Sequence, residues 1–268
     1  MALVKTEAII LRSMKLGETS KLLTLYARKS GILKLVAKGA RQSKSRLMGS
    51  LEPLYVVEVV YYEKESRELQ ILSQVSIVYV PKYVFTDADK TVLALACGEM
   101  VTRLEKPGDV NPGVYGLLRA TLEAFDQPDV DARLIFLAFQ LRLLEHIGLS
   151  PGLQKCFGCE TSETSEGRYD FANARLYCER CAQKTSQGKE IKKETLQVLR
   201  ELLRLPLRKI GHLQWQASIQ AEIYRFLTSF YHYHLEEMGA LKSIAVLAQM
   251  KSLANATSSQ ADSNKESS

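Results

Sequence analysis

The chain has 268 residues, of which 46% are hydrophobic, and this is enough for a core in one large or two small domains. Its formal net charge is +6, but residues 1–50 hold 11 Lys and Arg against 2 Asp and Glu. The positive charge is therefore a local feature of the N-terminal fifth. No apolar run approaches the length of a membrane span, and the first residues lack the cleavage site of a signal peptide, so we expect a cytoplasmic protein.

The first 80 residues predict a small barrel. Five segments rich in β-branched and aromatic residues are separated by short turns, with no helix of any length between them. The predicted strands are 3–12, 21–28, 31–38, 54–62 and 68–80. A five-stranded barrel of this size is typical of the OB-fold, which commonly binds single-stranded nucleic acid. An SH3-like barrel is the competing prediction on strand count.

The basic residues of this barrel predict a polyanion-binding face. They fall on predicted strands and on the loop that follows the third strand, so they belong to a folded surface rather than to a disordered arm. Tyr26 is an added candidate for stacking on bases, although a place in the core is an equal alternative for it. The predicted DNA-binding residues are Arg12, Lys15, Lys21, Lys34, Lys38, Arg41, Lys44, Arg46 and Tyr26.

After Pro81 the apolar period changes to that of helices. Asp87 is a predicted N-cap, Pro112 a predicted first helical residue, and Gly148 a predicted stop. We expect one helical domain in two parts, 82–149 and 189–250, followed by a disordered tail at 251–268 that lacks bulky apolar residues. The predicted helices begin near 87, 112, 130, 190 and 216 and end near 106, 125, 147, 205 and 238.

Residues 150–188 interrupt the helical pattern and hold four of the five cysteines. Two C-x2-C pairs with 18 residues between them have the spacing of a four-cysteine zinc site. Four thiolates leave no position open for water, so the predicted zinc ion is single and structural. Two disulfides or free thiols are the alternatives, and the expected cytoplasm disfavours disulfides. The predicted ligands are Cys156, Cys159, Cys178 and Cys181, and Cys97 is predicted to be a core residue.

The chain lacks the common catalytic motifs. It contains no Walker A loop, no G-x-G-x-x-G and no H-E-x-x-H, and the four histidines suggest structural roles. We therefore expect a binding protein that takes no small-molecule substrate, and not an enzyme.

The N-terminal sequence resembles the bacterial recombination protein O (RecO) family. The likeness is carried by E-x-S at Glu18 and Ser20, by AKGAR at Ala37–Arg41 and by Ser45-Arg46, and the order of barrel, helices and zinc insert agrees with it. The resemblance implies a recombinational repair mediator of the RecF pathway that binds single- and double-stranded DNA and anneals complementary strands. It further implies that the protein acts on DNA coated by single-strand binding protein and, with RecR, helps to load RecA.

The same resemblance implies that the helical region binds the acidic C-terminal tail of single-strand binding protein. By charge alone, the candidates for that contact are Arg119, Arg133 and Arg142. Two other functions remain open from the sequence. The chain is alternatively a zinc-stabilised adaptor whose basic face binds an acidic protein, or a nuclease without a recognisable motif.

Overall fold

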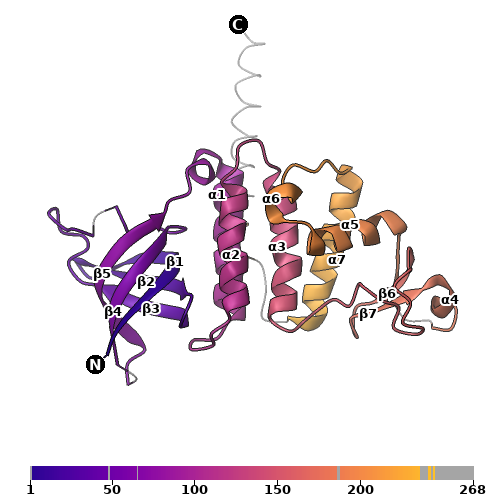
Figure 1. Ribbon diagram of the computed structural model, residues 1–268, viewed down its shortest axis with the longest axis horizontal. Helices are drawn as coiled ribbons and strands as arrows, with labels where there is room; N and C mark the ends of the chain where they lie inside the picture. The colour runs from indigo at the N-terminus through magenta and orange to yellow at the C-terminus, as the bar shows by residue number, and fades with distance from the viewer. Residues whose placement is uncertain are drawn as a thin grey trace, which may run out of the picture.

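A computed structural model describes residues 2–47, 49–64, 66–185, 188–235, 241, 242 and 244. The molecule is elongated, with a β-barrel at one end, a block of helices in the middle and a small cysteine-bearing unit at the opposite end (Figure 1). The predicted tail at 251–268 and the predicted end of the last helix at 236–238 lie outside the described residues.

Five strands close into a barrel in the order β1-β2-β3-β5-β4. The β3–β5 pair is parallel and the other neighbouring pairs are antiparallel. This is the OB-fold, so the predicted fold is confirmed, as a mixed α+β chain with a four-cysteine insert. The strands are β1 (Ala2–Leu16), β2 (Ser20–Ala27), β3 (Gly31–Ala37), β4 (Val56–Glu63) and β5 (Leu69–Tyr79).

The barrel has a core of its own, built by the two-residue alternation of its strands. Side chains such as Leu23, Leu25 and Leu35 are fully buried inside it, while their neighbours in the chain point outward. Strand β1 is bulged between Ile10 and Arg12, which lets one long strand bend and pair with both β2 and β4. The bulge also sets which residues of the second half of β1 face outward.

A short 3-10 turn, Tyr83–Thr86, leads into the helical block. The predicted N-cap of the first helix is confirmed, since the Asp87 carboxylate accepts a hydrogen bond from the Lys90 N–H at 3.0 Å. Helix α3 is buried nearly all round and forms the centre of the block. The helices are α1 (Ala88–Leu104), α2 (Pro112–Phe125), α3 (Ala132–His146), α5 (Lys193–Arg204), α6 (Leu207–Ile210) and α7 (Ala217–His234).

Two tyrosine–glutamate pairs join the barrel to the helices. The Tyr26 hydroxyl on β2 donates to Glu105 Oε2 at 2.7 Å, and the Tyr115 hydroxyl on α2 donates to Glu7 Oε1 at 2.6 Å. The pairs run in opposite directions across the interface, so each side supplies one donor and one carboxylate. Hydrogen bonds to charged acceptors are among the stronger ones in proteins, and they fix the orientation of the barrel on the helices.

The cysteine-bearing unit contains a three-stranded sheet in the order β7-β6-β8. Its elements are β6 (Gly167–Asp170), β7 (Arg175–Cys178), the short helix α4 (Glu179–Ala182) and β8 (Lys189–Ile191). The predicted helix start at residue 190 is wrong, because Gly167 and Arg168 of β6 pair with Ile191 and Glu190. The sheet therefore continues past the predicted end of the insert at 188, and α5 begins only at Lys193.

Among the described residues, no helix combines the length and apolar character that crossing a membrane requires.

Candidate nucleic-acid interface and metal site

The register of the barrel brings several predicted cations onto its outer surface. Arg12 lies opposite Thr24, which lies opposite Lys34, so these three side chains share one face of β1, β2 and β3. Lys15 lies opposite Lys21 at the end of the β1–β2 hairpin, but these two alternate to the other side of the strands, which Lys21 shares with its partner Ala37. Lys38, Arg41, Lys44 and Arg46 follow β3 in the loop and are all exposed.

Two of the predicted cations are paired with carboxylates. Lys21 Nζ lies 2.9 Å from Glu52 Oε1, and Lys34 forms an ion pair with Glu68. The hydrogen bond from Lys34 holds the pKa of the exposed Glu68 carboxyl below its usual range. Exposed pairs of this kind are weak and exchange readily with other anions. Within the described part of the chain, Arg12, Lys15, Lys38, Lys44 and Arg46 form no ion pair and are exposed.

Arg41 positions the basic loop. Its guanidinium Nη1 donates to the carbonyl oxygens of Gly17 and Glu18 at 2.9 and 2.8 Å, and its backbone N–H donates to Thr19 O at 2.9 Å. These three acceptors form the tip of the β1–β2 hairpin. These bonds hold the loop and the hairpin together as one surface. Because Nη1 of Arg41 is already bonded within the protein, only its other guanidinium N–H groups are left to bind a phosphate.

The prediction that Tyr26 stacks on bases is wrong. Its side chain is 0% exposed, and its hydroxyl is bonded to Glu105 at the interface with the helices. Burial, with the Glu105 hydrogen bond next in importance, raises the pKa of Tyr26 far above its usual value, so the phenol remains a donor. Tyr55, directly before β4, packs edge-on against Phe85 with ring centroids 6.1 Å apart.

Sequence reasoning missed an apolar row beside these cations. Met14 lies opposite Leu22, Leu22 opposite Val36, and Val36 opposite Ile71. These four side chains share the outer face with Arg12 and Lys34, two positions away along their strands, and each is partly or well exposed. The signal was present in the alternation of β1 and β2, but it required the register of the strands, which the sequence alone does not fix.

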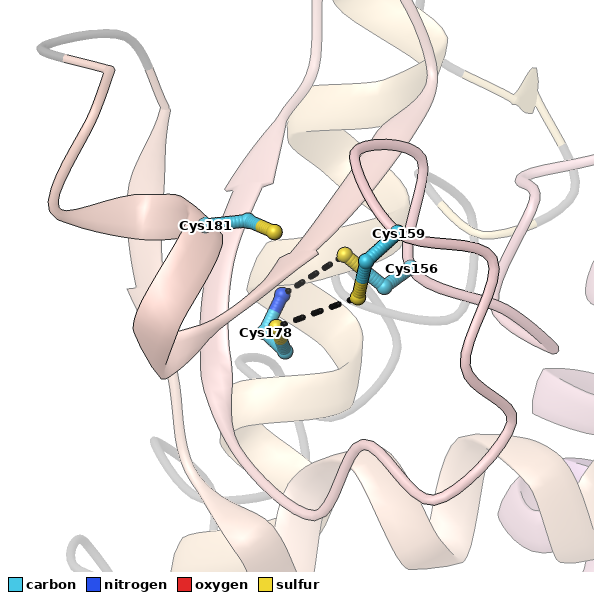
Figure 2. A group of neighbouring side chains, drawn as sticks. All are labelled: Cys156, Cys159, Cys178 and Cys181. Carbon is cyan, nitrogen blue, oxygen red and sulfur yellow. Dashed lines mark hydrogen bonds between the residues drawn. The ribbon is translucent and has the colours of Figure 1, made fainter.

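The four predicted metal ligands converge in space. Cys156 and Cys159 lie on the loop before β6, Cys178 ends β7 and Cys181 is on α4 (Figure 2). All four sulfur atoms lie within 4.8 Å of one another, and the Cys159 and Cys178 sulfurs are 3.8 Å apart. A tetrahedral zinc ion with Zn–S distances of about 2.3 Å requires sulfur–sulfur distances of roughly 3.8 Å. The thiols therefore fit a four-coordinate metal ion.

The backbone around Cys156 favours its thiolate form. Burial alone would raise the pKa of Cys156, but N–H groups of Cys178, Cys159 and Gly158 donate to its sulfur and lower the pKa to about 6. The Cys178 N–H lies 3.3 Å from that sulfur (Figure 2). A Cβ at Gly158 would lie only 3.0 Å from the Cys181 sulfur, so a glycine lets the two C-x2-C turns approach closely without a shift of the Cys181 side chain. This arrangement suits a closed site without a position for substrate.

The three arginines considered for the acidic tail have different environments. Arg119 pairs with Glu123 at 2.9 Å and lies over the Tyr79 ring. Arg142 donates to the carbonyl oxygens of Leu202 and Leu205 at the end of α5, and its burial lowers its pKa. Arg133 is exposed, 3.9 Å from an Asp89 carboxylate oxygen. Arg142 is thus committed to the internal packing of the helices.

Two family profiles match this chain. "Recombination protein O N terminal" matches residues 1–81, and "Recombination protein O C terminal" matches residues 86–243. The chain belongs to the recombination protein O family. Relatives in this family include proteins named DNA repair protein RecO from Pelotomaculum thermopropionicum and Alkaliphilus metalliredigens. The first is 30% identical over 92% of this chain and 94% of its own, and the second 27% identical over 88% and 95%.

Proposed function

We propose that this recombination protein O family member is a recombinational DNA repair mediator that binds single- and double-stranded DNA without sequence preference. The observation that carries the proposal is the outer face of β1–β3, where exposed cations flank an apolar row on a barrel of the oligonucleotide-binding type. The names of the relatives support the repair role. We place the protein in the bacterial cytoplasm, associated with the nucleoid.

The chemistry of this face suits strand annealing. Cations neutralise phosphates and release counterions, and contacts to the backbone carry no sequence information. The apolar row at Met14, Leu22 and Val36 offers a surface against which bases pack. A surface that screens the phosphates of two strands allows complementary bases to pair. No step of this requires ATP, in agreement with a mediator that is not an enzyme.

Family membership supports the partners we propose. The protein would act on DNA coated by single-strand binding protein, contacting the acidic tail of that protein through the helical block, where Arg133 is an exposed cation. With RecR it would help to load RecA. The alternative is that the basic face binds an acidic protein and not DNA. The DNA-binding experiment described next distinguishes these two partners.

The DNA-binding proposal is tested by fluorescence anisotropy with a mixed-sequence single strand across a salt series. Five cations free of ion pairs give an expected log–log slope of up to about 3.5, at roughly 0.7 per phosphate. Replacing Lys38, Lys44 and Arg46 with glutamine should lower the slope by about 2 and weaken binding strongly at low salt. The matched control replaces the exposed Lys193, Arg204 and Lys209 of the helical block with glutamine.

Each outcome of that series is informative. An unchanged slope in the folded barrel variant would remove the loop from the interface. Absence of binding by the parent at low salt would assign the basic face to an acidic protein, and cleavage of the strand with added divalent metal would reveal a nuclease.

We further propose one structural zinc ion at the four cysteines, supported by their spacing and by the 3.8 Å sulfur–sulfur distance. Metal analysis of the purified chain should find one zinc per molecule, and Cys159→Ser should lose it together with local protection of the unit from proteolysis. The helical block should keep its helix content in this variant. Zinc-free parent protein with four reactive thiols would contradict the proposal.

A further inference from the structure

The cysteine-bearing unit has an outer face whose composition the metal site does not explain. In its sheet, Tyr169 and Leu176 point toward the helices and are buried. Arg168 lies opposite Tyr177, so these two share the other face, and Arg175, two positions from Tyr177, lies on that face as well. Arg175 and the half-buried Tyr177 thus lie on the face away from the helices, while the Arg168 guanidinium donates to Gly188 O at 2.7 Å.

Phe157 adds a second aromatic ring to this region. Its side chain is 54% exposed, although it lies between two cysteines whose thiols meet at the metal site. Its backbone N–H donates to Leu176 O at 2.7 Å, which ties the loop to β7. The Arg175 guanidinium carbon lies 3.8 Å from the centre of the Phe157 ring, and the Tyr177 ring meets Phe157 edge-on at 5.9 Å. The three side chains form one preorganised aromatic and cationic surface.

The charge of Arg175 is not neutralised by the acid opposite it. Asp170 pairs with Arg175 in the register, but its carboxylate accepts hydrogen bonds from Ala172 and Asn173 at 2.8 to 3.3 Å. The unit also holds exposed Lys155 and Arg180, together with exposed Glu160 and Glu179, so it is not a strongly basic patch. Any polyanion it binds must therefore be held by ring contacts more than by net charge.

We propose that Phe157, Arg175 and Tyr177 form a second contact for single-stranded nucleic acid, in which a nucleobase stacks on the exposed rings and Arg175 meets the backbone. Stacking needs an unpaired base, so this surface selects single strands over duplex. It lies at the opposite end of the molecule from the barrel (Figure 1). The inference rests on the proposed function, because it adds a second strand contact to a DNA-binding chain.

The test places a fluorescent reporter at the surface of the full-length chain. Trp215 is the only tryptophan, so Phe157→Trp in a Trp215→Phe background reports on this position alone. A single strand should quench this tryptophan, while duplex of the same length should not. The matched control is Tyr224→Trp in the same background, on α7 at 59% exposure, and it should remain unquenched. Phe157→Ala with Arg175→Gln should weaken single-strand binding about fivefold or more, with unchanged metal content.

Combination with the Lys38, Lys44 and Arg46 variant separates the two proposals. Quenching that persists in the combined protein shows that the zinc unit binds a strand independently of the barrel. A parent protein that binds single strands while the tryptophan at 157 stays unquenched overturns the inference and leaves the barrel proposal standing. Failure of the parent to bind any DNA overturns both. Quenching by polyglutamate but not by DNA would assign the surface to an acidic protein and overturn the inference.

Discussion

The hydroxyl of Tyr26 should stabilise the junction between barrel and helices and should play no part in DNA binding. Tyr26→Phe removes the 2.7 Å hydrogen bond to Glu105 and a weaker contact to Asn111 O at 3.4 Å. The ring itself stays in place, so no cavity forms. The main cost is a partly buried carboxylate that loses its donor, and hydrogen bonds to charged groups contribute about 1.5–3 kcal/mol. We expect the free energy of unfolding to fall by about that amount.

Urea denaturation followed by far-UV circular dichroism measures this change, and a double-mutant cycle with Glu105→Ala isolates the pair. Because the two groups bond each other, the double variant should be less destabilised than the sum of the single variants. Single-strand affinity of Tyr26→Phe should stay within about twofold of the parent, since the ring is fully enclosed. Strictly additive effects of the two substitutions would refute a stabilising Tyr26–Glu105 hydrogen bond. A loss of single-strand affinity in Tyr26→Phe, without a loss of stability, would show that Tyr26 contributes to DNA binding.

Two further predictions concern the same scaffold. Thermal unfolding should show that Gly31→Ala destabilises the protein far more than Gly17→Ala. Both glycines have positive φ, so both substitutions strain the backbone. Only at Gly31 would the added Cβ also clash with the backbone, because it would lie 1.9 Å from Asp109 O. Arg208→Gln should lower stability near neutral pH, on the order of 0.5 kcal/mol. Partial burial would raise the pKa of Glu123, but hydrogen bonds from Arg119 and Arg208 outweigh it and lower the pKa. This contribution is present above the usual carboxyl value of 4.5 and is lost as pH falls through the lowered pKa, so parent and variant should converge in acid.

The sequence was sufficient for the elements whose signals are local. Asp87 caps its helix as predicted, helix α2 runs from Pro112 to Phe125 as predicted, and the C-x2-C spacing located a cluster that the structure brings within 4.8 Å. Each of these signals is complete within a few residues. The five strands were also predicted, because alternation and turn residues mark each of them separately, although β1 continues past its predicted end at 12 to Leu16.

The features that could not be predicted depend on contacts between distant segments. The sequence places Tyr26 on a strand of a basic barrel face. It becomes a buried residue only because the helices pack against the barrel and bring Glu105 into contact with it. The predicted helix start at residue 190 was wrong because Glu190 and Ile191 pair with β6, which lies more than 20 residues earlier in the chain. The apolar row at Met14, Leu22 and Val36 exists only in the register of three strands.

The hydrogen bonds that fix both ends of the molecule to the helices bear on the strand annealing that we propose. Tyr26 and Tyr115 tie the barrel to the helical block at one end. At the other end, Arg200 on α5 donates to the carbonyl oxygens of Leu153 and Thr164, at 2.9 and 2.7 Å. With these hydrogen bonds in place, we do not expect the cysteine-bearing unit to carry a bound strand to the barrel. A strand held at both surfaces must therefore span the helical block through its own flexibility. Pairing with a second strand would then take place on the barrel face, where the free cations screen both backbones.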